Sequence, residues 1–206
     1  MPSAEVGRKT REQILHTAMN VASVKGLAGL SIGELATELG MSKSGLFRHF
    51  GAKEQLQLAT VDAAMGVFER EVLNPALAAE AGLGRLRALM RAWVGYLERD
   101  VFTGGCFFVA ASADVDSRPG PVRDLIAEAG HAGIAAMTAE IEAAQRLGQL
   151  GAHVEARQLA FELHAFAMEA NWSRLLLDDD DACDRARAAI DTALARAGAG
   201  AKGDEK

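Results

Sequence analysis

The stretch from Leu30 to Phe50 constrains the fold more than any other part of the sequence. It reads LSIGELATELGMSKSGLFRHF, two short apolar-striped segments separated by Gly40. Each segment begins at a serine, Ser31 or Ser42, whose hydroxyl can cap a helix, and Gly51 follows the second segment. Two capped helices joined by a tight, glycine-containing turn make a helix-turn-helix.

The rest of the chain is also helical in its periodicity, and no segment alternates as a strand would. Its apolar residues are mostly Ala and Leu, and only four of its 206 residues are Pro. Thr10 and Gln13 stand in capping-box positions, and Pro75 is expected to stop the helix that starts near Lys53. Helices are predicted over residues 10–25, 31–39, 42–50, 53–73, 83–101, 121–147, 154–177 and 182–197, with a short apolar segment at 106–113. This pattern predicts an all-α fold of about nine helices.

Charge is distributed unevenly along the sequence. Residues 1–56 carry seven Lys and Arg against five Glu, whereas the remaining residues carry fifteen basic against twenty-three acidic side chains. The net charge of the whole chain is −6. This division into a basic N-terminal segment (residues 1–56) and an acidic remainder suggests two functions in one chain. We expect a helix-turn-helix domain over residues 1–52, a second helical domain over residues 53–197 and a disordered tail over residues 198–206.

The second helix of the motif has the side chains that a DNA-reading helix needs. Leu46 and Phe50 lie four residues apart and can pack inward on the preceding helix. The opposite side carries groups that hydrogen-bond to bases or phosphates or touch a thymine methyl group: Lys43, Ser44, Phe47 and Arg48. Gly45 costs about 1 kcal/mol relative to Ala in a helix, which suggests a close approach of backbone to DNA. On spacing alone, a helical hairpin with a solvated charged face remains the alternative.

Residues 10 to about 60 resemble the DNA-binding domain of the tetracycline-repressor (TetR) family of bacterial transcription regulators. The resemblance runs through TREQILHTAMNVASVKG, LSIGELATELGMSKSGLFRHF and GAKEQL. It implies that the third helix contacts DNA through Lys43, Ser44, Gly45, Phe47, Arg48 and His49. It also implies phosphate contacts from Thr10, Ser31 and Lys53, and the free N–H groups at the helix starts at Ser31 and Ser42 suit phosphate as well. The sequence has Phe47 where the family more often has Tyr, so a phenolic bond to phosphate is absent.

For the second domain, the resemblance implies helices that bind a ligand and form a dimer. GGCFF and ADVDSRPGPVRDL are similar to a pattern in one branch of the family. The predicted pocket residues are Trp93, Tyr96, Leu97, Cys106, Phe107, Phe108, Met137, Ile141, Phe161, His164, Met168 and Trp172. The predicted dimer-interface residues are Leu159, Leu163, Phe166, Ala170, Ile190 and Leu194. Aromatic and Met-rich stripes are more often part of a protomer's own core than of a pocket, and some of the predicted interface residues are expected to belong to that core as well.

Other classes of function have less support in the sequence. It contains no phosphate-binding glycine loop, GxSxG elbow, HExxH motif or CxxC pair, so we expect neither an enzyme nor a cofactor. Asp178–Asp181 stands between two helices, where a solvated loop is a better interpretation than a metal site. Cys106 follows two glycines at an expected helix start, where a thiol pKa tends to fall. A buried, inert cysteine is the better interpretation of Cys106, and a thiol- or metal-sensing regulator of the same fold is the alternative hypothesis.

The sequence gives no sign of export or of membrane insertion. No apolar run approaches the roughly 18 residues of a membrane span, and MPSAEVGRKTREQ lacks the apolar core of a signal peptide. The two cysteines cannot form a disulfide framework. We expect a cytoplasmic, homodimeric repressor that binds a palindromic double-stranded DNA operator and is released by a small-molecule effector.

Overall fold

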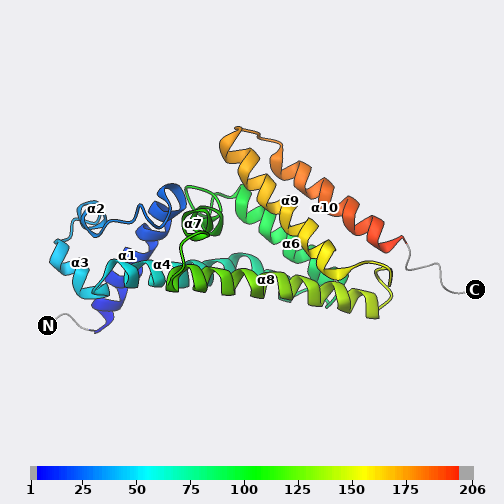
Figure 1. Ribbon diagram of the computed structural model, residues 1–206, viewed down its shortest axis with the longest axis horizontal. Helices are drawn as coiled ribbons and strands as arrows, with labels where there is room; N and C mark the ends of the chain where they lie inside the picture. Colours follow the sequence, from blue (N-terminus) through cyan, green and yellow to red (C-terminus); the bar gives the residue numbers. More distant parts are fainter. Residues whose placement is uncertain (1–3, 200–206) are drawn as a thin grey trace, which may run out of the picture. The chain divides into compact units, whose positions relative to one another are not determined.

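The computed structural model describes residues 4–199, and these form helices without any strand. The elements, drawn in Figure 1, are α1 (Ala4–Lys25), α2 (Ile32–Glu38), α3 (Lys43–Phe50), α4 (Lys53–Phe68), the π-helical η1 (Glu69–Leu73), α5 (Asn74–Leu77), α6 (Leu83–Glu98), α7 (Phe107–Val115), α8 (Pro121–Arg146), α9 (Ala156–Leu176) and α10 (Ala182–Gly198). Because α4, η1 and α5 follow one another without a break, the described residues contain nine continuous helical runs. The predicted all-α fold is confirmed. No helix within residues 4–199 is both long enough and apolar enough to cross a membrane.

The chain forms two compact units. The first contains the residues up to Val67 together with Phe102–Glu128, and the second contains Phe68–Val101 together with the residues from Ala129 onward. The first unit therefore includes nearly all of α4, the whole of α7 and the beginning of α8, which the predicted domain limits of 1–52 and 53–197 assign elsewhere. The predicted tail at 198–206 begins with Gly198, which still belongs to α10. Residues 200–206 lie outside the described residues.

The core of the first unit follows the apolar stripes of its helices. Ile14, Ala18 and Ala22 of α1 are fully buried, and Leu35 of α2 and Leu46 of α3 are buried with them. Glycines with positive φ angles of 71°, 62° and 74° follow these three helices at positions 26, 40 and 51, as the sequence predicted. At such φ angles glycine avoids the strain that a Cβ atom brings.

Helix α1 begins earlier than predicted. It starts at Ala4 rather than at Thr10, so Thr10 is an interior residue and not a helix cap. Its hydroxyl donates to the Val6 carbonyl oxygen at 2.9 Å, one turn back in the same helix. The capping-box interpretation was wrong because Thr10 and Gln13 match the spacing of a cap without standing at a helix end.

The helical run that starts at Lys53 passes through Pro75 instead of stopping before it. In η1 the backbone widens, and the Asn74 N–H donates to the Glu69 carbonyl five residues back. Pro75 then lies in the first turn of α5, where a missing N–H group is tolerated. One widened turn thus lets the helix continue where an unbroken α-helical pattern would have ended.

In the second unit, α9 and α10 lie side by side, and α6 packs against both (Figure 1). Leu163, Ala167 and Ala170 of α9 are buried, as are Ile190 and Leu194 of α10. The small side chains among them, Ala167 and Ala170, let neighbouring helices approach closely. The sequence pattern identified most of these buried residues as an apolar surface. In the structure this surface lies between two helices of the same chain.

Candidate nucleic-acid interface

Helix α3 has one buried and one exposed side. Leu46 is fully buried and Phe50 is nearly so, as their four-residue spacing predicted. The Ser42 hydroxyl oxygen accepts a hydrogen bond from the Gly45 N–H at 3.0 Å, which caps the helix. Phe47, with 53% of its surface exposed, lies on the opposite side. The predicted orientation of α3 is therefore confirmed.

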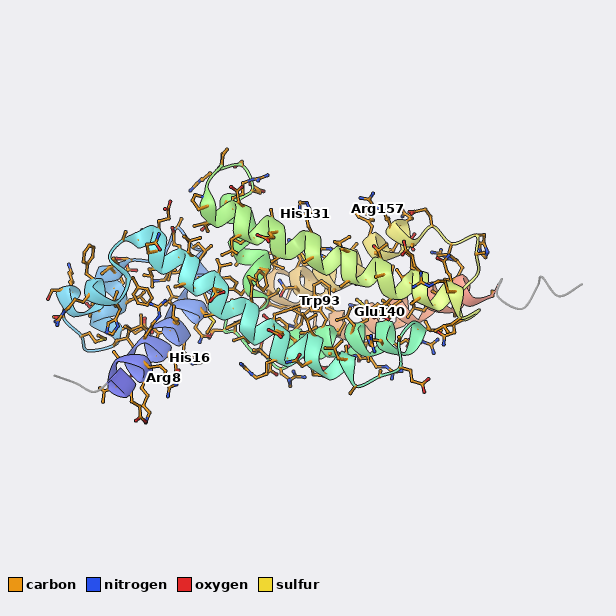
Figure 2. All side chains as sticks on the ribbon, turned by 90° about the horizontal axis from the view of Figure 1, so that it is seen from below. Arg8, His16, Trp93, His131, Glu140 and Arg157 are labelled. Carbon is orange, nitrogen blue, oxygen red and sulfur yellow. The ribbon has the colours of Figure 1, made fainter. Side chains whose placement is uncertain are left out.

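The exposed side of α3 is positively charged. Lys43, Ser44 and Arg48 are exposed there, and His49 is half-buried beside them. Within residues 4–199, Lys43 and Arg48 take part in none of the ion pairs, so their full charge is available to an external anion. Acidic residues neutralise other cations in the first unit: Arg8, which projects from α1 in Figure 2, pairs with Glu12 at 2.6 Å.

Two of the three glycines of the motif, Gly33 and Gly45, make room for polar side chains. A Cβ atom at Gly45 would lie 3.0 Å from the Ser42 hydroxyl oxygen, the atom that caps α3. A Cβ atom at Gly33 would lie 3.1 Å from Cε of Lys43. The structure therefore gives Gly45 a role in preserving the cap, in addition to the backbone approach to DNA that the sequence suggested.

Arg11 fixes the end of α3 to α1. Its guanidinium group donates to the carbonyl oxygen of His49 at 3.2 Å and lies 4.5 Å from the centre of the Phe50 ring. A cation at the C-terminal end of a helix also interacts favourably with the negative end of the helix dipole. Arg11 belongs to the basic N-terminal segment. The periodicity of α1 did not indicate that this side chain would contact a residue 38 positions away.

The predicted phosphate contacts already have partners inside the protein. The Ser31 hydroxyl accepts from the Glu34 N–H at 3.4 Å, which caps α2 as expected. The Lys53 ammonium group donates a hydrogen bond to the Ala28 carbonyl oxygen at 2.7 Å. Gln57, which the sequence did not single out, donates to the Leu27 carbonyl oxygen at 2.8 Å. Lys53 and Gln57 thus hold the loop that precedes α2.

Several of the predicted pocket residues form an aromatic cluster in the second unit. The Trp93 ring lies 5.4 Å from His164 and 5.7 Å from Phe68, in both cases edge to face, and Tyr96 lies 5.6 Å from Phe68. Burial lowers the pKa of His164, so this imidazole is neutral near pH 7. Phe68 was missed because it stands at the end of α4, where the pattern gave no contrast with its neighbours.

The other predicted pocket residues lie outside this aromatic cluster, in both units and on the surface. Leu97, Met137 and Ile141 are buried in the second unit, and Met168 is half-buried there. Three belong to the first unit, namely Cys106, Phe107 and Phe108. Phe161 and Trp172 are 65% and 47% exposed, so the prediction that they line an interior pocket was wrong for this chain alone.

The predicted dimer-interface residues face inward. Leu159, Leu163, Ala170, Ile190 and Leu194 are buried within one chain, and Phe166 is half-buried. The five buried residues therefore offer no surface to a second chain. Periodicity identified them as apolar but could not show which helix covers them. The exposed apolar side chains of this region are instead Phe161, Trp172, Leu175, Leu176 and Leu177.

The residues considered for metal or thiol sensing have ordinary structural environments. Asp179 and Asp181 accept hydrogen bonds from Arg185, and no cluster of three potential metal ligands occurs within the described residues. Cys106 and Cys183 are both buried. Burial, assisted by the nearby Glu98 carboxylate, raises the pKa of the Cys183 thiol, which opposes thiolate chemistry.

Comparison with protein families agrees with this geometry. A model described as bacterial regulatory proteins, tetR family, matches residues 14–60 and so contains α2 and α3. A second model, described as the tetracyclin repressor-like C-terminal domain, matches residues 82–190, more than half of the chain.

Individual relatives are similar over part of the sequence and over nearly all of the fold. The HTH-type transcriptional regulator BetI of Rhizobium meliloti is 28% identical over 91 residues, 44% of this chain and 45% of BetI. The chain spans less than half the length of the curated relatives it matches. A TetR regulator from Chloroflexus aurantiacus has a TM-score of 0.86 at 22% identity, covering 93% of this chain and 97% of that one. AibR, solved with isovaleryl coenzyme A and operator DNA, has a TM-score of 0.71 at 22% identity, covering 91% and 98%.

The family matches account for both halves of the sequence, and they extend the resemblance that the helix-turn-helix motif suggested. This family consists of transcriptional regulators and not of enzymes. The chain therefore belongs to the TetR family and is a DNA-binding transcriptional regulator.

Proposed function

We propose that the protein is a homodimeric repressor that binds an inverted-repeat operator in bacterial cytoplasm and is released by a small molecule. The observation that carries the proposal is the exposed side of α3. There, Lys43 and Arg48 are exposed near Phe47, and neither takes part in an ion pair within residues 4–199. Arginine and lysine pair with guanine or phosphate, and an exposed aromatic ring suits a thymine methyl group.

A dimer is proposed because one short helix reads few base pairs. Two-fold proteins place two recognition helices about one DNA turn apart, ~34–36 Å. The exposed aromatic rings of α9, Phe161 and Trp172, favour this helix as the dimer surface, on a different side from the buried apolar surface between α9 and α10. The Trp172→Asp variant should sediment as a monomer, whereas Leu77→Asp, at an apolar residue that is 60% exposed on α5, should remain a dimer. Two monomeric variants or two dimeric variants would contradict this choice of surface.

The effector is proposed to bind at the aromatic cluster of Trp93, Tyr96, His164 and Phe68. Apart from one neutral imidazole, these rings favour a ligand with a large apolar part. AibR is described with isovaleryl coenzyme A and operator DNA, which makes an acyl thioester a reasonable first compound to test. The expected coupling of about 1–3 kcal/mol would weaken operator binding roughly 5- to 150-fold.

A binding selection tests the proposal. The purified protein is incubated with random duplex DNA, and the bound sequences are read after several rounds. Enrichment of an inverted repeat would support a dimeric sequence reader. Enrichment of a single half-site would exclude the dimer, and enrichment of nothing at moderate salt would exclude sequence-specific binding by α3.

A further inference from the structure

The sequence motifs GGCFF and ADVDSRPGPVRDL have no part in the proposed DNA contacts, but they lie against a helix of the DNA-binding region. Both belong to the first compact unit. The first motif leads into α7 and the second begins within it, and α7 packs against α1 (Figure 1). Residues about 80 positions apart in the sequence thus meet at the end of α1.

Hydrogen bonds join the loop before α7 to the last turns of α1. The Asn20 side-chain oxygen accepts from both the N–H and the hydroxyl group of Thr103, at 3.2 and 3.1 Å. The Ser23 hydroxyl accepts from the Gly104 N–H at 3.0 Å and donates to the Asn20 carbonyl oxygen at 2.8 Å. These bonds fix the position of the loop relative to the last turns of α1.

A glycine on each side permits this close approach. A Cβ atom at Gly104 would collide with the carbonyl oxygen of Ser23, and that oxygen is fixed in the backbone of α1. A Cβ atom at Gly26 would collide with the carboxylate of Asp114 in α7. Gly26 also has a φ angle of 71°, which disfavours other residues independently.

Asp114 holds the segment that leads into the helix-turn-helix. Its carboxylate accepts a hydrogen bond from the Ala28 N–H at 2.7 Å. From α4, Lys53 donates to the Ala28 carbonyl oxygen, so charged side chains from two helices hold both backbone groups of this residue. Leu27 and Leu30 on either side of it are fully buried. Ser31, the cap of α2, lies three residues after Ala28, so the position of Ala28 constrains where α2 begins.

We propose that Asp114 is a positioning residue for DNA binding, one that sets the orientation of α2 and α3 through the backbone of Ala28. The inference rests on the proposed function, since it assumes that α3 reads DNA. A carboxylate that accepts a backbone N–H makes a stronger bond than a neutral acceptor. Without it, the loop before α2 samples other positions, and two α3 helices no longer match one operator at the same time.

Three variants distinguish the effect of losing the hydrogen-bond acceptor from the effect of losing the negative charge. Asp114→Ala removes the acceptor, whereas Asp114→Asn removes the charge and keeps an oxygen that can accept from Ala28. Asp116→Ala removes the same charge two residues away, where the side chain is exposed. Any general gain in DNA affinity from losing a negative charge is therefore shared by all three variants.

The experiment measures binding to the duplex enriched from the random pool and to an unrelated duplex of equal length. Hydrogen exchange of the amides at residues 26–31 is followed without DNA, and thermal unfolding confirms that each variant is folded. We expect Asp114→Ala to weaken operator binding at least about 5-fold relative to Asp116→Ala and to accelerate exchange at residues 26–31. Binding to the unrelated duplex should be the same for Asp114→Ala and Asp116→Ala, and Asp114→Asn should recover most of the lost operator affinity.

Equal operator affinity for Asp114→Ala and Asp116→Ala would overturn the inference. An equal loss on both duplexes would also overturn it, because misplaced helices lose the operator selectively. If the unaltered protein enriches no duplex, the proposed function fails and the positioning role fails with it. The exchange data then still show whether Asp114 holds the loop, so the two failures are distinguishable.

Discussion

Helices α3 and α9 each bury an apolar side, but they differ in the apolar side chains that they leave exposed. The exposed side of α3 combines the charges of Lys43 and Arg48 with one aromatic ring. The exposed side of α9 presents the rings of Phe161 and Trp172. A charged side suits a polyanion such as DNA, and an apolar side suits another protein surface. The comparison shows that what a helix leaves uncovered says more about its partner than what it buries.

Because the buried residues between α9 and α10 contact no external partner in this account, substitutions there should change stability alone. Leu163→Ala removes a fully buried side chain between α9 and its neighbours and should lower the free energy of unfolding by about 2–5 kcal/mol. Leu147→Ala, at a residue that is 59% exposed, should cost no more than about 0.5 kcal/mol. Urea unfolding measures both. Equal losses would show that these buried residues are less tightly packed than described.

Substitutions on the exposed side of α3 should act on DNA binding without affecting stability. Arg48→Ala is expected to weaken operator binding by about 1–3 kcal/mol, because it removes a hydrogen-bonding cation. Arg91→Ala removes another exposed positive charge, from α6, and serves as the control. Fluorescence titration with labelled operator gives both affinities. If the two variants bind equally well, Arg48 has no part in recognition.

Loss of a helix cap should have an intermediate effect, confined to the first unit. Ser42→Ala removes the acceptor for the Gly45 N–H and should destabilise α3 by about 1 kcal/mol. Ser44→Ala removes a neighbouring hydroxyl that caps no N–H group in the described residues, so its effect should be smaller. Hydrogen exchange of α3 amides distinguishes them. A larger effect from Ser44→Ala would refute the assigned cap.

The smallest expected effect is the pH dependence of the second unit. Burial lowers the pKa of His164 below its usual value near 6.5, so the unfolded chain binds a proton at this site more readily than the folded chain. Stability from this residue is therefore complete above about pH 6.5 and is lost as the pH falls below it. The melting temperature of His164→Phe should fall less between pH 7.5 and 5.5 than that of the unaltered protein. An identical fall in both would remove His164 as the cause.

Local signals made the first unit predictable. Ser31 and Ser42 are caps because a hydroxyl three residues before an unsatisfied N–H group is a local arrangement. The glycines that end α1, α2 and α3 follow from the same short-range geometry. Thr10 matched this spacing by chance, and only the observed start of α1 at Ala4 reveals the error.

Contacts between distant residues escaped prediction. No sequence pattern indicated that Asp114 would hold Ala28, or that Arg11 would lie over Phe50. On α9, the apolar period identified Leu163 correctly as an inward residue but could not tell a partner helix in the same chain from one in a second chain. Phe161 and Trp172 were grouped with the interior because aromatic residues are usually buried.

The central claim is that the exposed side of α3 reads bases. Repeating the binding selection with Phe47→Ala tests it most directly, since this ring is exposed, uncharged and absent from the core. The account predicts that an inverted repeat is still enriched but that one thymine preference disappears from both half-sites. An unchanged consensus sequence, with affinity equal to that of the unaltered protein, would contradict the claim.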